Sequence, residues 1–492
     1  MDEHRTNHAP APTLDLRALA AQSMRQNGFV TELSPEAERE REALHDGLIR
    51  AGDGVRDMRA LLWSSIDNRE SRDLDQIEVT EQLPGGDVRV MVGVADVDAL
   101  VPQGSALDRH AAENTCSVYS GVTVFPMLPE RLSTDLSSLN LGVDRLAIVI
   151  DIVVAQDGSI RSGDVYRAVV KNRAKLAYED VSSWLAGGPI PPGVSAVSGM
   201  DRELRLQYEV AQKLQKLRYE HGALDLETIE ARPVAVDGKI VELALTEKSH
   251  ARELIEDFMI AANGAMARFL EAKGRSSIRR VVKSPERWAR IVALAATHGT
   301  TLPPEPDAPA LGHFLAEQKA KDRERFVDLS LAVVKLMGPG EYALERAGFA
   351  HTGHFGLATQ DYTHSTAPNR RFADLITQRL LKATLRGAPS PYSDDELSTL
   401  AARCTLKEND ARKVERFMRK VGAAMLLTER IGDEFDAIVT GANPKGTFVR
   451  LLLPPAEGRV VRGDQGLDVG DKLRVKLVAT EPRKGFIDFV RA

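Results

Sequence analysis

The chain has 492 residues, 43% of them hydrophobic and 28% charged, which is an ordinary globular composition with material for two to four domains. The formal net charge of -6 excludes a uniformly basic nucleic-acid binder, so any nucleic-acid site must be a local basic surface. Two cysteines, Cys116 and Cys404, are too few for a disulfide framework or a zinc motif and favour a reducing cytoplasm. The polar N-terminus predicts no signal peptide, and no apolar run approaches the ~18 residues of a membrane span.

Residues 1–59 are predicted to form a small N-terminal piece. Residues 1–13 are polar and contain two prolines, which favours a disordered segment or an arm. Residues 14–27 and 35–51 have the patterns of two short helices. The piece is too short for a sizeable core of its own, so we expect it to pack on the next domain.

Residues 60–390 alternate predicted strands and helices, which indicates an α+β domain with a mixed sheet and surrounding helices. Residues 77–82 and 88–95 flank the turn Pro84-Gly85-Gly86-Asp87 and predict a β-hairpin. Residues 351–357 are predicted to lie on a loop or short strand. Other strands are predicted at 62–66, 117–125 and 144–154, and helices at 106–114, 201–221, 249–273, 310–321, 322–337 and 368–384.

Residues 391–431 are predicted to be a long, charged helical connection to a different kind of domain. From residue 432, short apolar runs alternate with glycine-containing turns. Five strands in about sixty residues favour a small closed barrel of the OB type. The predicted strands are 435–440, 447–453, 459–461, 472–478 and 485–489.

Three aspartates, Asp67, Asp73 and Asp75, crowd between two predicted strands. Asp73 and Asp75 are two residues apart, so an extended backbone places them on one face. Like charges held this close resist ionisation, and a hard cation such as Mg²⁺ would relieve the conflict. Two such ions could activate water and stabilise the leaving oxygen of a phosphodiester. The alternative is a solvated acidic loop balanced by Arg69 and Arg72.

Two further acids, Asp96 and Asp98, end the strand of the predicted hairpin. They could add negative charge near the aspartate cluster. An equally good interpretation makes them strand-end or helix-capping carboxylates with no part in the site.

A second candidate element surrounds Arg370 and Arg371. Pro368 suits the first position of a helix, so both arginines are predicted in its first turn, where the helix end also attracts anions. Two arginines there indicate that a polyanion binds. An arginine beside a scissile phosphate could contribute ~3–4 kcal/mol to the transition state. The alternative is a structural ion pair between Arg370 and Asp374.

Aromatic residues supply the third candidate element. Tyr119 could stack on a base, at ~1–3 kcal/mol per base. Tyr362 and His364 precede the arginines and are predicted to line the same channel, with His354 nearby. The alternative is ordinary packing for the tyrosines and simple hydrogen bonding for the histidines, His351 included.

Taken in order, these motifs resemble the RNB catalytic domain of the ribonuclease II/ribonuclease R family. The resemblance covers roughly residues 60–390, and the predicted C-terminal barrel resembles the S1-type RNA-binding domain of the same enzymes. The matching segments are Asp67 with 72–76, 94–97, 125–133, 138–140, 222–226, 254–259, 354–357 and 367–371.

The resemblance implies a processive, metal-dependent hydrolase, using Mg²⁺ or Mn²⁺, that degrades single-stranded RNA from its 3′ end to nucleoside 5′-monophosphates. It also implies a cytoplasmic protein, which we expect to be monomeric and not bound to a membrane. Carried over residue by residue, it implies metal ligands at Asp67, Asp73, Asp75 and Gln76, catalytic roles for Asp75 and Arg370, and a clamp on the 3′-terminal nucleotide at Tyr119.

The sequence departs from the family pattern in three places. Gln76 stands where the family usually has a fourth acid. Residues 274–280 lack the aromatic residue expected to stack at the 3′ end, so Arg275 or Arg279 is expected to replace it. Residues 1–59 stand in place of two N-terminal cold-shock barrels. Because of Gln76, a catalytically impaired RNA-binding protein remains an alternative, and a DNA exonuclease is a third possibility that sugar discrimination would decide.

Overall fold

The computed structural model describes residues 14–45, 54–227, 230–236, 239–246, 248–444 and 446–492. Residues 1–13 and 46–51, which carry the predicted arm and the end of the second predicted helix, lie outside this description. The two N-terminal helices are α1 (Leu16–Gln26) and α2 (Pro35–Ala43). Buried residues of α1 pack against the long helix α12 (Asp394–Leu427), and Ala37 of α2 joins the main core, so the piece packs on the body as expected.

The body is organised around a seven-stranded mixed sheet with strand order β1-β8-β7-β4-β3-β2-β9. The predicted hairpin is confirmed, with Gln76 opposite Val94 in antiparallel register. Two strand pairs, β1–β8 and β2–β9, are parallel. The strands are β1 (Arg56–Asp57), β2 (Ser64–Asp67), β3 (Gln76–Gln82), β4 (Val88–Ala95), β7 (Asp144–Val154), β8 (Ile160–Lys171) and β9 (Ala174–Ala177).

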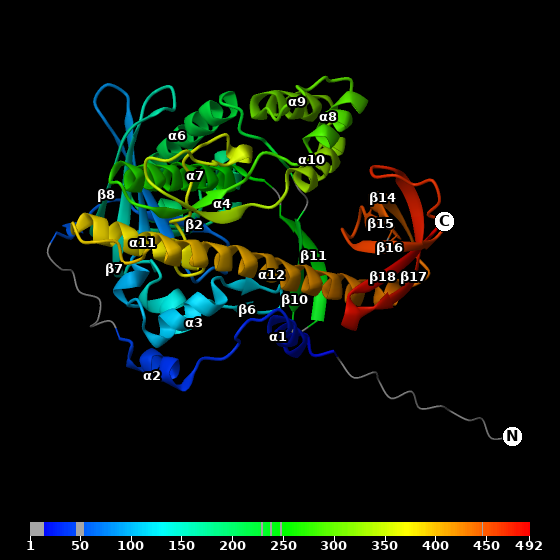
Figure 1. Cartoon of the computed structure of the whole chain (residues 1–492), viewed down its shortest axis with the longest axis horizontal. Helices are drawn as coiled ribbons and strands as arrows, with labels where there is room; N and C mark the ends of the chain where they lie inside the picture. Colours follow the sequence, from blue (N-terminus) through cyan, green and yellow to red (C-terminus); the bar gives the residue numbers. More distant parts are fainter. Residues whose placement is uncertain (1–13, 46–53, 228–229, 237–238, 247, 445) are drawn as a thin grey trace.

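Successive side chains along each strand point to opposite faces of the sheet. Both faces are apolar, and each is covered by helices. Ile77 and Val79 of β3 face the core shared with α3 (Ala106–Asn114) and α11 (Phe372–Leu385). Val90 and Val92 of β4 face the opposite core. That core is shared with α4 (Tyr178–Leu185), α6 (Met200–Glu220) and α7 (His250–Ala272), and Figure 1 shows α6 and α7 lying beside each other.

Smaller elements surround this body. The helices α8, α9 and α10 enclose an apolar cluster of their own that includes Trp288, Phe314 and Phe326. The elements are β5 (Val118–Tyr119), β6 (Val124–Phe125), a π-helical turn (Arg131–Leu136), α5 (Pro192–Ser195), β10 (Glu230–Val236), β11 (Lys239–Thr246), β12 (Ser277–Val281), α8 (Trp288–Thr297), α9 (Ala308–Lys321), α10 (Arg323–Met337), β13 (Glu341–Glu345) and two 3₁₀ turns, Val97–Ala99 and Phe355–Leu357.

A 34-residue helix, α12 (Asp394–Leu427), connects the body to the C-terminal barrel (Figure 1). A capping box between Ser393 and Glu396 fixes its start. Its last turns contribute Ala423, Ala424 and Leu427 to the barrel core. At 1.5 Å per residue the helix spans about 50 Å, so it fixes the barrel to the body over a long contact.

The C-terminal barrel is closed and five-stranded, with order β14-β15-β16-β18-β17, which confirms the predicted OB-type barrel and the α+β class. Among the described residues, the structure contains no helix that is both long enough and apolar enough to cross a membrane. The strands are β14 (Glu434–Asn443), β15 (Gly446–Leu451), β16 (Glu457–Arg462), β17 (Lys472–Glu481) and β18 (Phe486–Arg491).

Candidate active site

The predicted acids lie at the ends of neighbouring strands in the sheet. Asp67 is the last residue of β2, and Asp75 comes directly before β3. The backbone carbonyl of Asp75 accepts from the amide of Ala95 at 2.9 Å, which joins it to the end of β4. The side chain of Asp75 is buried, with 3% of the residue exposed. The loop that carries Asp73 is therefore anchored to the sheet at both ends.

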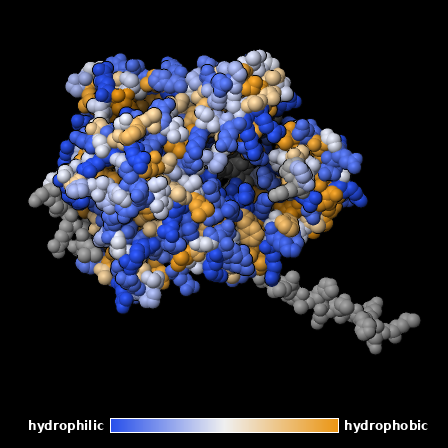
Figure 2. Space-filling view, viewed as in Figure 1, coloured by the Kyte–Doolittle hydropathy of each residue, from blue (hydrophilic) through white to orange (hydrophobic). Residues whose placement is uncertain are grey.

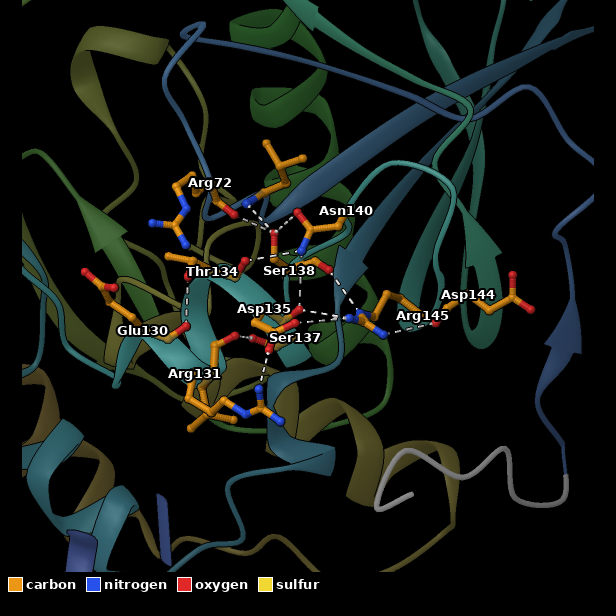
Figure 3. Close-up of polar contacts among 12 residues, drawn as sticks. Arg72, Glu130, Arg131, Thr134, Asp135, Ser137, Ser138, Asn140, Asp144 and Arg145 are labelled. Atoms are coloured by element: carbon orange, nitrogen blue, oxygen red, sulfur yellow. Dashed lines mark hydrogen bonds and ion pairs between the residues drawn. The ribbon is translucent and has the colours of Figure 1, made fainter. Parts of the chain in front are cut away.

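Ser138 fixes the middle of this loop, at the centre of the polar network in Figure 3. Its hydroxyl accepts from the amide of Leu74 at 3.0 Å and donates to the carbonyl of Arg72 at 2.7 Å. Arg145 in turn donates from Nε to the carbonyl of Ser138 at 3.2 Å and from Nη2 to that of Asp135 at 3.0 Å. The acidic loop thus rests on a hydrogen-bonded segment about sixty-five residues further along the chain.

The neighbouring Ser137 connects the same segment to the arginine-containing turn. Its hydroxyl donates to Oδ1 of Asn369 at 2.6 Å, and the backbone amide of Asn369 donates to Oδ1 of Asp75 at 3.0 Å. The next residue, Arg370, places Nε 3.5 Å from Oδ2 of Asp75. Consecutive serines therefore hold the acidic loop and the arginine turn in register, and the structure brings Asp75 and Arg370 together.

Tyr119 lies at the same site. It is in the short hairpin β5–β6, and its hydroxyl donates to Oδ2 of Asp73 at 3.3 Å. Its backbone amide donates to Oε1 of Glu415 on α12 at 3.0 Å. The residue is 42% exposed, so an aromatic face remains open to solvent beside the acids.

Burial dominates the electrostatics of these acids. It raises the pKa of Asp75 to about 7, against the opposing effect of the Arg370 guanidinium. It also raises the pKa of Asp67, to which the charge of Asp73 adds. Burial therefore makes it unfavourable for both acids to ionise together unless positive charge beyond that of Arg370 is present.

The donor set fits a divalent cation, although the acids do not form a ready-made cage. Within the described part of the chain, no three Asp, Glu, His or Cys side chains are grouped closely enough to hold a metal ion as they stand. The expected three-aspartate cluster is therefore not preformed, because each carboxylate has another partner. Tyr119 binds Asp73, Asn369 binds Asp75, and the amide of Asn68 donates to Asp67 at 2.7 Å. Uncompensated carboxylate charge and hard oxygen donors nevertheless suit such an ion.

The helix that follows Arg370 and Arg371 begins later than the sequence predicts. Helix α11 begins at Phe372, so Arg370 and Arg371 precede it instead of occupying its first turn. Arg371 has extended backbone angles and donates to Oδ1 of Asp374 at 2.8 Å, three residues on. The predicted structural ion pair exists, but it involves Arg371 in place of Arg370. Arg371 is thus engaged inside the fold, and only Arg370 faces the acids.

Arg275 and Arg279 do not reach this site, which corrects the expectation that they replace the missing aromatic residue. Arg275 donates to the carbonyl of Ala388, beyond the far end of α11, roughly 20 Å along that helix from Arg370. Arg279 lies on β12 and is 1% exposed, with Nη2 3.5 Å from Glu271 and Nη1 3.8 Å from Asp361. Burial and internal pairing keep it from any ligand.

The predicted channel aromatics form a packed cluster. The ring of Tyr362, 9% exposed, lies edge-to-face with His354 at 5.5 Å and His364 at 5.7 Å. Nδ1 of His364 lies 2.8 Å from the hydroxyl of Tyr342, and Nδ1 of His354 accepts from the amide of Leu357 at 3.1 Å. The alternative of packing and hydrogen bonding therefore describes these residues better than base stacking.

Asp96 and Asp98 also belong to the structural interior. Lys382 Nζ lies 2.8 Å from Oδ1 of Asp96, and Arg379 Nε lies 2.9 Å from Oδ1 of Asp98. Both cations come from α11, so these ion pairs fix that helix to the sheet. Neither acid adds charge to the candidate site.

Sequence reasoning missed three residues of this arrangement. Ser138 stands only within a segment that matches the family and Ser137 stands in none, because serine carries no strong signal of its own. Glu415, which accepts from the amide of Tyr119, was missed as well, because it is one of many charged residues in α12.

The fold and the site together define a class: a mixed α+β domain with an acid–arginine site, joined by a long helix to an OB-type barrel. A family model described as "RNB domain" matches residues 55–387, and one described as "RNase II-type exonuclease C-terminal S1 domain" matches residues 433–492. The chain belongs to the RNB family.

Named relatives and solved structures agree with this family. The chain is 29% identical over 479 residues to Ribonuclease R of Thermotoga maritima, covering 89% of this chain and 65% of that protein. It is 32% identical over 424 residues to Ribonuclease R of Escherichia coli, covering 80% of this chain and 49% of that protein. It thus spans about half to two-thirds of the length of these relatives.

Among solved structures, that of Mycoplasma genitalium RNase R in complex with ribose-methylated single-stranded RNA matches with a TM-score of 0.88 and 22% identity. The match covers 97% of this chain and 78% of that one. At this identity the likeness concerns the fold.

Proposed function

We propose that the chain is a hydrolytic 3′→5′ exoribonuclease that degrades single-stranded RNA processively to nucleoside 5′-monophosphates. The observation that carries the proposal is the 3.5 Å approach of Arg370 Nε to Oδ2 of Asp75, beside the Tyr119 hydroxyl on Asp73. Three distant segments of sequence converge there on one acidic, arginine-containing site. Family membership and the names of the relatives support the same activity.

The residues can be given roles in this chemistry. Asp67, Asp73 and Asp75, with the amide oxygen of Gln76, would hold Mg²⁺ or Mn²⁺, and such an ion would supply an activated water and charge neutralisation at the leaving oxygen. The side chain of Arg370 is 43% exposed, so it can move from Asp75 to the phosphate. There it would stabilise the charge that develops in the transition state.

The substrate contacts follow from the exposed groups. The open face of Tyr119 would stack on the 3′-terminal base and hold the last phosphodiester against the acids. The barrel strands β16 and β17 expose Arg459, Arg462, Lys472 and Lys476, which suits a local basic surface for the RNA backbone. Figure 2 shows a hollow between the body and the barrel with hydrophilic residues around it, and we place the approach of the RNA there.

We also propose that the protein acts as a monomer in the cytoplasm, on RNA 3′ ends. Both cysteines are free thiols, which suits a reducing compartment.

The activity is tested with purified protein and 5′-labelled poly(A), with Mg²⁺ and with EDTA. We expect the labelled RNA to pass from full length to a short 5′-terminal product with few intermediate lengths, and only in the presence of the divalent ion. RNA that is bound but not shortened under either condition would instead establish the catalytically impaired RNA-binding protein.

A further inference from the structure

Tyr119 lies on a hairpin, residues 118–125, that is too small to hold its own position. Tyr119 and Val124 pair across β5 and β6, and the hydroxyl of Ser120 closes the turn by donating to the carbonyl of Thr123 at 2.6 Å. Each strand has only two residues, and an isolated hairpin is marginally stable at best in water. The position of the Tyr119 ring therefore depends on what the hairpin packs against.

The hairpin packs against the middle of α12. Val118 is buried in a cluster with Ala411 and Val414 of that helix, and Phe125 packs against the same cluster. The last turns of α12 belong to the core of the barrel. One helix therefore contacts both the Tyr119 hairpin and the RNA-binding barrel.

A polar contact joins the backbone of Tyr119 itself to this helix. The neighbouring amide of Ser120 donates to the carbonyl of Thr123 at 3.1 Å across the hairpin, so strand alternation directs the amide of Tyr119 away from β6. There it donates to Oε1 of Glu415 at 3.0 Å. A hydrogen bond to an ionised carboxylate is roughly twice as strong as one between neutral groups. Glu415 thus fixes the outer edge of the hairpin at the residue that carries the ring.

The same strand is also attached to the reactive groups. Two residues before Tyr119, the amide of Ser117 donates to the carbonyl of Arg370 at 3.0 Å. The Tyr119 hydroxyl donates to Asp73. The segment that Glu415 holds from the side of α12 therefore contacts both the acidic loop and the arginine turn on its other side.

We propose that Glu415 is a positioning residue that holds Tyr119 in the orientation needed to stack on the 3′-terminal base, an inference that rests on the proposed function. It acts through the backbone amide of Tyr119. Without this bond the hairpin would keep its apolar packing, but the aromatic face of Tyr119 would no longer be held beside the acids.

The test compares two RNA oligomers that differ only at the 3′-terminal nucleotide, which either carries its base or is abasic. Binding is measured in EDTA so that neither RNA is degraded. Stacking of the terminal base should make the wild type bind the complete RNA at least about 5-fold more tightly than the abasic one. Tyr119→Ala and Glu415→Ala should both nearly abolish this preference. Because each ratio compares two RNAs on one protein, a change in the protein's charge affects both affinities and cancels.

Three further variants isolate the hydrogen bond. Glu415→Gln keeps an oxygen acceptor for the Tyr119 amide and should keep most of the preference. Asp410→Ala is the matched control, since Asp410 is also a half-buried acid of α12 but pairs with Lys413 of its own helix at 2.8 Å. It should leave the preference unchanged. The double variant of Tyr119→Ala with Glu415→Ala should show no smaller preference than Tyr119→Ala alone, because no ring is left to position.

The outcomes separate this inference from the proposed function. If Tyr119→Ala abolishes the preference and Glu415→Ala retains it, Glu415 does not position Tyr119 and the proposed stacking stands. If the wild type shows no preference, the stacking role and this inference are both overturned, while the digestion of poly(A) still decides the nuclease activity. If Glu415→Gln or Asp410→Ala removes the preference as fully as Glu415→Ala, the cause is the charge or the helix, and the inference is overturned.

Discussion

Arg370 and Asp75 meet across the candidate site, with Nε of the arginine 3.5 Å from Oδ2 of the aspartate. The aspartate is buried and the arginine side chain is 43% exposed, so one is fixed while the other can follow a substrate. This pairing of a rigid acid with a movable cation makes two substitutions especially informative.

Asp75→Asn should lower kcat on single-stranded RNA by about 100-fold or more, the scale of losing one preorganised electrostatic group. RNA affinity should remain largely intact, because the carboxylate is buried and the backbone contacts of Asp75 do not depend on its charge. Single-turnover hydrolysis and filter binding measure the two quantities. An equal loss of binding, or retained cleavage, would contradict the role given to Asp75.

Arg370→Ala should lower kcat by about 10²- to 10³-fold, since the guanidinium would act on charge that develops at the phosphate. Its melting temperature should stay near that of the wild type. Arg371→Ala is the comparison variant, because Arg371 is the next residue but is paired with Asp374 inside the fold. Breaking a buried ion pair costs ~3–5 kcal/mol, so this variant should instead show a clear fall in melting temperature. A loss of kcat in Arg371→Ala together with a loss of melting temperature in Arg370→Ala would contradict the roles given to the two arginines.

Tyr119 can be separated into its ring and its hydroxyl. Tyr119→Phe removes only the hydrogen bond to Asp73 and should leave RNA affinity within a few-fold of the wild type, since such bonds contribute ~0.5–1.5 kcal/mol. Tyr119→Ala also removes the stacking surface and should cost ~1–3 kcal/mol of binding. Titration of a fluorescent RNA with a free 3′ end decides between them, and similar affinities for both variants would rule out stacking.

Ser138→Ala tests whether the acidic loop must be held in place. The variant loses the bonds to Leu74 and Arg72 and should lower kcat by about 10-fold with little change in KM, at ~1 kcal/mol per bond. Ser133→Ala is the control, because among the described residues the Ser133 hydroxyl contacts only carbonyls of its own segment, at 3.4 Å. Equal effects from both variants would show that the whole segment, and not the contact with the loop, is responsible.

The histidine cluster predicts a pH dependence of stability. Burial lowers the pKa of His354 to about 4, from an ordinary value of 6.5. Between these values the unfolded chain binds a proton that the folded chain does not, so stability falls as the pH falls from 6.5 to 4. His354→Asn can keep an acceptor for the Leu357 amide without titrating. Relative to this variant the wild type should lose up to ~1.4 kcal/mol per pH unit across that window, measured by urea unfolding. If the free energies of unfolding of the wild type and of His354→Asn changed in parallel with pH, the low pKa given to His354 would be contradicted.

Much of the architecture follows from local pattern. The hairpin β3–β4, the strand β7, the helices α3, α6 and α7 and the five barrel strands all have clear periodicity or turn signals, and each lies within a few residues of its predicted bounds. The strands β8 to β13 were not predicted. Their partners are distant or their pattern is mixed, as in β8, where exposed and buried residues alternate only in the second half. Pairing across a sheet decides such segments more than local sequence does.

The candidate site also has features that local sequence predicts and features that depend on distant parts of the chain. Sequence spacing was enough to select Asp75, Arg370 and Tyr119, which the fold brings together. It could not tell Arg371 from Arg370, because the start of α11 depends on a backbone bridge between Arg371 and Cys116 that no local rule anticipates. Nor could it show that Arg279 is buried, since burial depends on the neighbours of β12.

The central claim is that water attacks the terminal phosphodiester at this site and the 3′ oxygen of the remaining chain leaves. Digestion in ¹⁸O-labelled water, followed by mass spectrometry of the released nucleotides, tests it most directly. The account predicts nucleoside 5′-monophosphates with one ¹⁸O in the phosphate, absent from Asp75→Asn and from reactions with EDTA. Cyclic phosphates, nucleotides without the label, or release that continues in EDTA would contradict it.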